Sequence, residues 1–179
     1  MESAQAVLDF WFVESGSKRW FKQSDDFDAL CRERFLPTLE AARLGECWKW
    51  RSTPEGRCAE IIVLDQFSRN LFREDLRAYT QDGIALVLAQ EAVARGDDLR
   101  MNDDQRYFSY MPYMHSESLA VHKEGLRLFG ALGNTEALRY AIAHEKVIAE
   151  FGRYPTRNAD LGRTSTPEEE QYLANRKGW

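Results

Sequence analysis

Signals that begin and end α-helices recur along the whole chain, and this pattern limits its fold more than any other feature. Apolar residues repeat at helical spacing, and no convincing run alternates between apolar and polar residues with the period of a strand. Capping residues precede most of the apolar runs, and several runs end at a glycine. We therefore predict an all-α protein of about eight helices with short connections. Because no linker or low-complexity tract interrupts the chain, we expect one domain over residues 1–179.

The boundaries of the expected helices follow from these signals. Thr53-Pro54 combines a capping side chain with a proline at the first helical position, and residues 166–169 have the spacing of a capping box. A proline is expected to kink or end a helix, so we predict a kink or a new start at Pro37 and an end before Pro112. The expected helices cover about 4–15, 54–68, 75–95, 103–111 and 117–132, with a further helix that begins after Ser24, one capped by Asn134 or Thr135 that ends before Gly152, and a short segment from 167.

Composition and charge exclude several classes of partner. The net charge of −5 and the pI of about 5.3 argue against nucleic acid or an anionic membrane as the main partner, although a local basic pocket is compatible with them. No stretch has the roughly 20 apolar residues needed to cross a bilayer, and the N-terminus lacks the features of a signal peptide. Three cysteines without ligand-type spacing indicate reduced thiols, so we predict a cytoplasmic protein. The sequence identifies no protein partner and no oligomeric state.

Ionisable side chains occur at positions that should face the core. Asp65 is the next residue on the apolar face formed by Ile61 and Ile62. His122 and His144 lie on the apolar faces of two later helices. A charge in an apolar interior costs several kcal/mol unless it is paired and hydrogen-bonded. Each of these residues therefore needs a partner.

The connections beside these helices offer such partners. Arg69 follows Asp65 by four residues, which is the favourable order for an ion pair within a helix. Two interpretations follow from this set. Arginine forks can clamp carboxylates and lock helices together, or the same residues can line a cleft that holds a small anionic or polar ligand. In the second interpretation the ligand-binding residues are Asp65, Arg69, Asn70, His115, Glu117, Arg157 and Asn158, and the candidate acid–base residues are His115, His144 and Glu117.

A short motif that occurs twice in the sequence supports grouping these residues. Residues 67–70 and residues 155–158 each place Arg-Asn just beyond an expected helix, with another arginine downstream. Two matches of four residues could arise by chance. They would also suit repeated helix pairs of the tetratricopeptide kind, although no regular period of about 34 residues is visible.

Metal and nucleophile chemistry have less support. All three histidines lie among the ionisable residues described above, and histidine is a common metal ligand. However, His115 and His122 are seven residues apart, and no His-Glu-x-x-His or Glu-x-x-His pair is present. The sequence contains neither a Gly-x-Ser-x-Gly elbow nor a glycine-rich phosphate loop. We therefore predict no metal site and no cofactor.

Three ordered segments resemble the signatures of a known family. Residues 65–70 (DQFSRN), 110–117 (YMPYMHSE) and 151–158 (FGRYPTRN) are similar to the three motifs of the "domain of unknown function 924" family, and residues 7–12 and 161–163 are similar to its flanking marks. The resemblance covers nearly the whole chain. It implies a bacterial, all-helical protein with a tetratricopeptide-like array, and it implies no activity. Thr156 stands where the family usually has histidine, and His122 stands where it often has glutamine.

The motifs and the resemblance together lead to one preferred function and one alternative. We predict that a small anionic or polar ligand binds in a pocket built from the two Arg-Asn segments and the His-Ser-Glu segment, with acid–base catalysis as an extension of this role. The alternative is a non-enzymatic helical scaffold that binds a peptide or protein partner. A deep pocket would favour the first, and a broad groove lined by exposed aromatic residues would favour the second.

Overall fold

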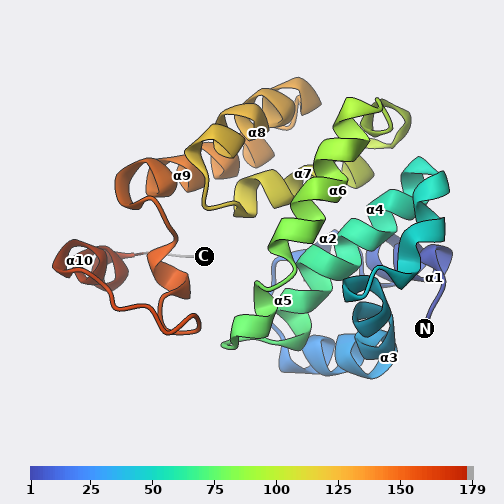
Figure 1. Ribbon diagram of the computed structural model, residues 1–179, viewed down its shortest axis with the longest axis horizontal. Coiled ribbons are helices and arrows are strands. Elements are labelled where there is room, and N and C mark those ends of the chain that lie inside the picture. Colours follow the sequence, from blue (N-terminus) through green and yellow to red (C-terminus); the bar gives the residue numbers. More distant parts are fainter. Residues whose placement is uncertain (177–179) are drawn as a thin grey trace.

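The computed structural model describes residues 1–176, and all of its regular structure in this range is helical. Figure 1 shows the N-terminal helices packed at one end of the molecule and the C-terminal elements at the other. The α-helices are α1 (Ala4–Leu8), α2 (Ser17–Trp20), α3 (Asp25–Arg43), α4 (Pro54–Ile62), α5 (Ser68–Leu71), α6 (Asp82–Ala94), α7 (Asp103–His115), α8 (Leu119–Leu132), α9 (Thr135–Phe151) and α10 (Pro167–Asn175). The 3-10 segments are η2 (Glu46–Ser52), η4 (Leu76–Ala78), η5 (Asp98–Arg100) and η6 (Pro155–Arg157).

Side-chain caps begin most of the helices where the sequence predicts them. The side chains of Ser3, Ser24, Thr53 and Asn134 accept backbone hydrogen bonds from the first turns of α1, α3, α4 and α9. Thr166 and its partner in the first turn of α10 form the expected capping box. Each cap satisfies N–H groups that have no partner within the helix, so these starts are fixed by local chemistry. The all-α prediction is confirmed.

The predicted start of the helix over residues 75–95 is wrong. Asp75 does cap a helical turn, but that turn is the short 3-10 segment η4, and the chain then turns again before α6 begins at Asp82. A capping residue satisfies the first N–H groups of a 3-10 turn as well as those of an α-helix. Asp75 is therefore a capping residue, as predicted, but it caps the short 3-10 segment η4 and not the long helix.

The predicted end before Pro112 is also wrong. Helix α7 continues through Pro112 and ends at His115, and α3 likewise continues through Pro37. Proline removes one backbone hydrogen bond, and tertiary packing can compensate for this loss. Pro112 is buried among neighbouring side chains, so packing holds the last turn of α7 in place. The following helix, α8, accordingly starts after Ser118 and not after Ser116.

Two segments of π-helix interrupt the helical pattern. The first, η1, spans Asp9–Ser15 directly after α1, and the second, η3, spans Val63–Phe67 between α4 and α5. A π-helical turn inserts an extra residue into the turn, which redirects the side chains that follow it, and such turns are frequent at functional sites. The second segment carries Asp65, which the sequence analysis singled out.

One large hydrophobic core joins the first nine helices. The helix α4 packs against α1, α6 and α7, while α7 packs against α8 and α8 against α9. Aromatic rings fill the centre, and Trp11 makes edge contacts with Phe67 and Phe108 at ring-centroid distances of 5.5 and 5.3 Å. A small separate cluster forms around Val147, Ile148 and Tyr154. Within residues 1–176, no helix is long and apolar enough to span a membrane.

A glycine in α4 tests the close approach of η2 to that helix. A methyl group on Gly56 would overlap the carbonyl oxygen of Trp50, which is backbone and has little freedom to move. We expect Gly56→Ala to lower the free energy of unfolding by about 1–3 kcal/mol, as overpacking does in other cores. Urea denaturation measures this change.

Gly83, in the first turn of α6, provides the matched control. A methyl group there would meet no atom within 4 Å. Since alanine is the better helix former by about 0.5–1 kcal/mol, Gly83→Ala should be neutral or stabilising. Equal effects of the two substitutions would contradict the predicted contact with Trp50.

Candidate functional site

The buried carboxylate of Asp65 lies at the centre of the candidate site. The residue is 0% exposed, and its Oδ1 atom lies 2.7 Å from Nδ1 of His115 at the end of α7. Arg69, in α5, donates from Nη1 to the same oxygen at 3.2 Å and to the Asp65 backbone carbonyl at 2.7 Å. The predicted Asp65–Arg69 ion pair is therefore confirmed. The side-chain amide of Gln66 donates to the second oxygen, so both carboxylate oxygens have partners.

A second carboxylate, Asp82, joins two arginines that are far apart in the sequence. Arg69 donates two parallel hydrogen bonds to Asp82, both of 2.9 Å. Arg157, in η6, donates from Nη1 to the same carboxylate at 3.1 Å. Asp82 is the first residue of α6, so the two Arg-Asn segments of the sequence meet at the start of this helix. Two positive charges thus share one carboxylate.

Two tyrosine rings and a backbone carbonyl hold Arg157 in place. Its guanidinium carbon lies 4.8 Å from the ring centroid of Tyr79 and 4.5 Å from that of Tyr154. Its Nη2 atom donates to the backbone carbonyl of His115 at 2.9 Å. The hydroxyl of Tyr79 in turn donates to Asp160 at 2.9 Å. Cation–π contacts on a partly desolvated guanidinium contribute about 0.5–2 kcal/mol each, so this arginine is well ordered.

The electrostatics of the cluster set the protonation states of Asp65 and His115. Burial raises the pKa of Asp65, but the electrostatic interactions with His115 and Arg69 and the hydrogen bonds from His115 and Gln66 outweigh it, so this pKa lies below its usual range. Burial, assisted by Arg69, lowers the pKa of His115 despite the nearby carboxylate. At neutral pH the imidazole is therefore uncharged. Since Asp65 is ionised and can only accept, Nδ1 of His115 carries the hydrogen.

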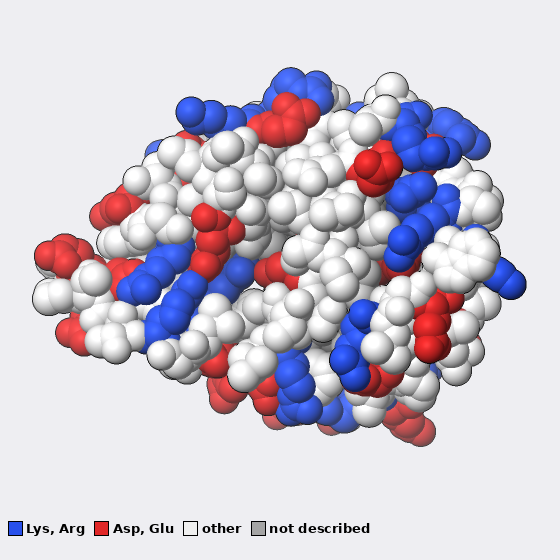
Figure 2. Space-filling model, viewed as in Figure 1, with Lys and Arg blue, Asp and Glu red and all other residues white. Residues whose placement is uncertain are grey.

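The other imidazole nitrogen of His115, Nε2, is the one that does not contact Asp65. Within the described residues, Nε2 has no hydrogen-bond partner. It also does not belong to the fully buried polar atoms that lack a partner. The cluster as a whole is only partly covered. The exposed side-chain fractions are 20% for Arg69, 19% for Asp82, 12% for His115 and 11% for Arg157. Figure 2 shows charged side chains gathered on the face where the C-terminal elements approach α6.

Glu117 and Asn158 belong to a neighbouring cluster. Glu117 accepts two hydrogen bonds from Arg163, at 2.7 and 2.9 Å, and one from the backbone N–H of Tyr154 at 2.8 Å. Asn158 accepts from Arg163 and donates to the buried carboxylate of Glu169, in α10. Arg153 binds Glu169 through two hydrogen bonds. This second cluster attaches the C-terminal segment to the connection between α7 and α8.

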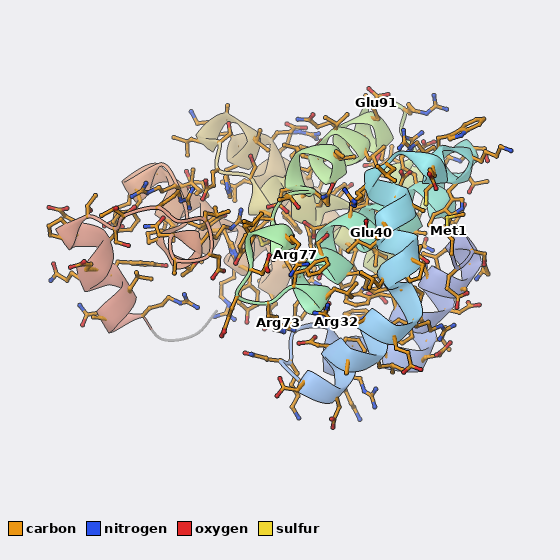
Figure 3. The ribbon with its side chains drawn as sticks, turned by 60° about the horizontal axis from the view of Figure 1, so that its bottom comes forward. Met1, Arg32, Glu40, Arg73, Arg77 and Glu91 are labelled. Atoms are coloured by element: carbon orange, nitrogen blue, oxygen red, sulfur yellow. The ribbon has the colours of Figure 1, made fainter. Side chains whose placement is uncertain are left out.

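Asn70 lies apart from both clusters. Its side chain donates to Asp28, in α3, at 2.7 Å, and Arg73 also binds Asp28. Figure 3 shows Arg73 beside Arg32 and Arg77 on the face turned toward the viewer. The two Arg-Asn segments therefore behave alike. In each, the arginine contacts Asp82, and the asparagine contacts a bracing carboxylate elsewhere.

The two remaining histidines pack around Tyr154. Nε2 of His122 donates to the carbonyl of Ser116 at 2.8 Å, and Nδ1 of His144 donates to the carbonyl of Tyr140 at 2.8 Å. The ring of Tyr154 makes edge contacts with both imidazoles. Burial is the main cause that lowers the pKa of His144 to about 3. These histidines are neutral members of the packing between α8, α9 and η6.

Of the predicted site residues, the structure brings Asp65, Arg69, His115 and Arg157 together. Glu117 and Asn158 belong to the neighbouring cluster, His144 packs against Tyr154, and Asn70 lies apart. Asp82 and the Tyr79 ring also belong to the cluster, and neither was predicted from the sequence. One signal in the sequence could have indicated Asp82: Arg69 and Arg157 together need a further carboxylate to balance their charges. The misplaced start of the helix over residues 75–95 hid it, because Asp82 then fell inside a helix and not at its first residue.

Within residues 1–176, no group of three or more His, Cys, Asp or Glu side chains is arranged to hold a metal ion. Two surface hollows lie away from the Asp82 cluster. One, of about 540 Å³, is lined by residues at the start of α9, and the other, of about 370 Å³, is lined by residues that precede and begin α3.

Comparisons with known proteins agree with this architecture. A family model described as "Bacterial protein of unknown function (DUF924)" matches residues 7–177. The chain belongs to this family. A solved structure of a protein of unknown function from Agrobacterium tumefaciens is similar over 97% of both chains, with 36% sequence identity and a TM-score of 0.92. No curated protein matches the chain. The expected DUF924 membership and the all-helical fold are thus confirmed.

Substitution of Asp65 tests the buried centre of this DUF924 protein. Asp65→Ala leaves Arg69 and His115 without their shared carboxylate, and removing one partner of a buried pair costs about 3–5 kcal/mol. The melting temperature should fall strongly. Glu136→Ala, which removes a largely exposed ion pair with Arg139 in α9, should change it within error. Similar melting temperatures for the two variants would show that the Asp65 carboxylate does not stabilise the fold to this extent.

Acidification tests the neutral state of His144. Its folded pKa of about 3 lies below the ordinary value of 6.5, so the unfolded chain binds a proton more readily. The free energy of unfolding should therefore fall as the pH drops below about 6.5. In His144→Gln this fall should be less steep between pH 6.5 and 4. Parallel curves from urea denaturation would contradict the lowered pKa.

Proposed function

We propose that this protein binds a small anionic ligand at the exposed edge of the Arg69–Asp82–Arg157 cluster, with His115 as an acid–base group. The observation that carries the proposal is the sharing of one carboxylate by two arginines beside an imidazole nitrogen that no described residue engages. Family membership names no activity, so the proposal rests on the geometry of the cluster.

The arginine pair has unused capacity to bind an anion. A guanidinium carries five N–H donors, and Arg157 uses one to Asp82 and one to the His115 carbonyl. Burial and the positive charge of Arg69 both lower the pKa of Arg157, which means that its charge is held at some cost. An incoming anion would offset the repulsion between the two arginines. The anion would also accept hydrogen bonds from the N–H groups of Arg157 that remain free.

The Asp65–His115 pair supports an acid–base role. A carboxylate that accepts from Nδ1 fixes the tautomer and orientation of the imidazole, which leaves the Nε2 lone pair available to take a proton. Nε2 lies on the same residue whose backbone carbonyl binds Arg157, so an anion on Arg157 would be close to the imidazole. A ligand with an acidic proton could transfer it to Nε2.

The scaffold alternative has less support. It requires a broad groove lined by exposed aromatic residues. The hollow of about 540 Å³ is lined instead by Thr135, Glu136, Leu138, Arg139 and Ile142. We also infer a cytoplasmic location for the proposed activity. All three cysteines are buried free thiols, which supports a reducing compartment.

Thermal melting with added anions tests the proposal. Phosphate, sulfate or a small carboxylate should raise the melting temperature of the parent protein more than chloride does at matched ionic strength. The stabilisation should follow mass action and reach about 2.7 kcal/mol at a hundredfold excess over the dissociation constant. It should vanish in Arg157→Gln, which keeps bulk and hydrogen-bond donors but removes the charge.

Two controls separate specific binding from general salt effects. Sulfate stabilises proteins by exclusion from their surface, so the difference between parent and variant is the informative quantity. Arg163→Gln removes a guanidinium six residues away, from the Glu117 pair, and should keep the anion-dependent shift. Arg157→Lys keeps the charge without the planar fork and should show a weakened shift. Equal shifts in parent and Arg157→Gln would remove the anion site.

A further inference from the structure

The charge balance of the cluster limits the kind of anion that it can hold. Two positive side chains, Arg69 and Arg157, face two negative ones, Asp65 and Asp82, and His115 between them is neutral. Outside this set, Arg163 neutralises Glu117, and Asp160 adds one negative charge behind Tyr79. The cluster therefore has no excess of positive charge. A partly buried site of this kind tolerates one additional negative charge better than two.

We propose that the ligand is a small monocarboxylate, and that His115 takes up one proton when this ligand binds. This inference rests on the proposed anion site and specifies its chemistry. A carboxylate presents two oxygens in one plane, which suits the planar fork of an arginine, and Arg69 already holds Asp82 in this way. A dianion such as sulfate would leave a negative charge uncompensated even with His115 protonated.

The proton uptake follows from the groups around His115. Burial and the positive charge of Arg69 oppose the charged imidazole, while Asp65 and Asp82 favour it. A carboxylate bound on Arg157 would add a further negative charge near the imidazole and so favour its charged form. The other ionisable groups near His115 are either neutral or paired with an opposite charge. Nε2 of His115 is therefore the atom that takes up the proton. The groups that face His115 from the packed elements are Asp65 from η3, Arg69 from α5, Asp82 from α6, His122 from α8, His144 from α9 and Arg157 from η6.

Acetate and sulfate distinguish the two charge classes. Acetate stays a monoanion and sulfate a dianion between pH 8 and pH 6. At pH 7.5 and equal anion concentrations, with the ionic strength equalised by sodium chloride, the part of the melting-temperature shift that Arg157→Gln abolishes should be larger for acetate than for sulfate. A larger Arg157-dependent shift with sulfate would overturn the monocarboxylate assignment and leave the anion site standing. No Arg157-dependent shift with either anion would remove the anion site itself.

The pH dependence of acetate binding tests the proton uptake. If one proton is bound with the ligand, the apparent affinity for acetate should rise as the pH falls from 8 to 6, by up to about tenfold per pH unit. In His115→Gln the acetate shift should persist but lose this dependence. Nuclear magnetic resonance of the imidazole protons in the parent gives a readout that needs no variant. Acetate should move the titration of one histidine to higher pH, and an unchanged titration would overturn the uptake.

Discussion

The burial of the Asp65 carboxylate is the constraint on which much of the structure depends. A charged group with no exposure to solvent is tolerated only where partners surround it, and here they come from three elements. Gln66 is adjacent in η3, Arg69 reaches back from α5, and His115 arrives at the end of α7. If α7 ended before Pro112, His115 would be misplaced. The π-helical turn, the proline-containing helix and the ion pair are therefore parts of one arrangement.

Asp82 extends this arrangement to the C-terminal part of the chain. Arg69 contacts both Asp65 and Asp82, and Arg157 contacts Asp82 and the backbone of His115. A residue from η6 is thus fixed against two elements that lie 75 and 42 positions earlier in the chain. The asparagines beside the two arginines bind separate carboxylates, and this division explains why the Arg-Asn pair occurs twice. One residue reaches the shared centre, while the other anchors its segment to a neighbouring element.

Much of the fold could be predicted from local chemistry, and the errors have local causes. Caps such as Ser24 and Thr53 bind N–H groups of their own first turn, so the sequence alone locates these starts. The pairing of Asp65 with Arg69 also follows from a spacing of four residues. By contrast, Asp82 meets Arg157 only through tertiary packing, which no local pattern encodes. Pro112 misled the prediction because a local rule was overridden by burial.

The composition of the centre bears on whether it only braces the helices. Well-packed apolar residues often replace buried ion pairs with no loss of stability, so bracing alone does not require two arginines on one carboxylate. Mutual repulsion contributes to the lowered pKa of Arg157, and several of its N–H groups have no described acceptor. A purely structural lattice gains nothing from either property. Both favour a site in which an anion accepts hydrogen bonds from the unused N–H groups of Arg157, beside the imidazole nitrogen of His115 that no described residue engages.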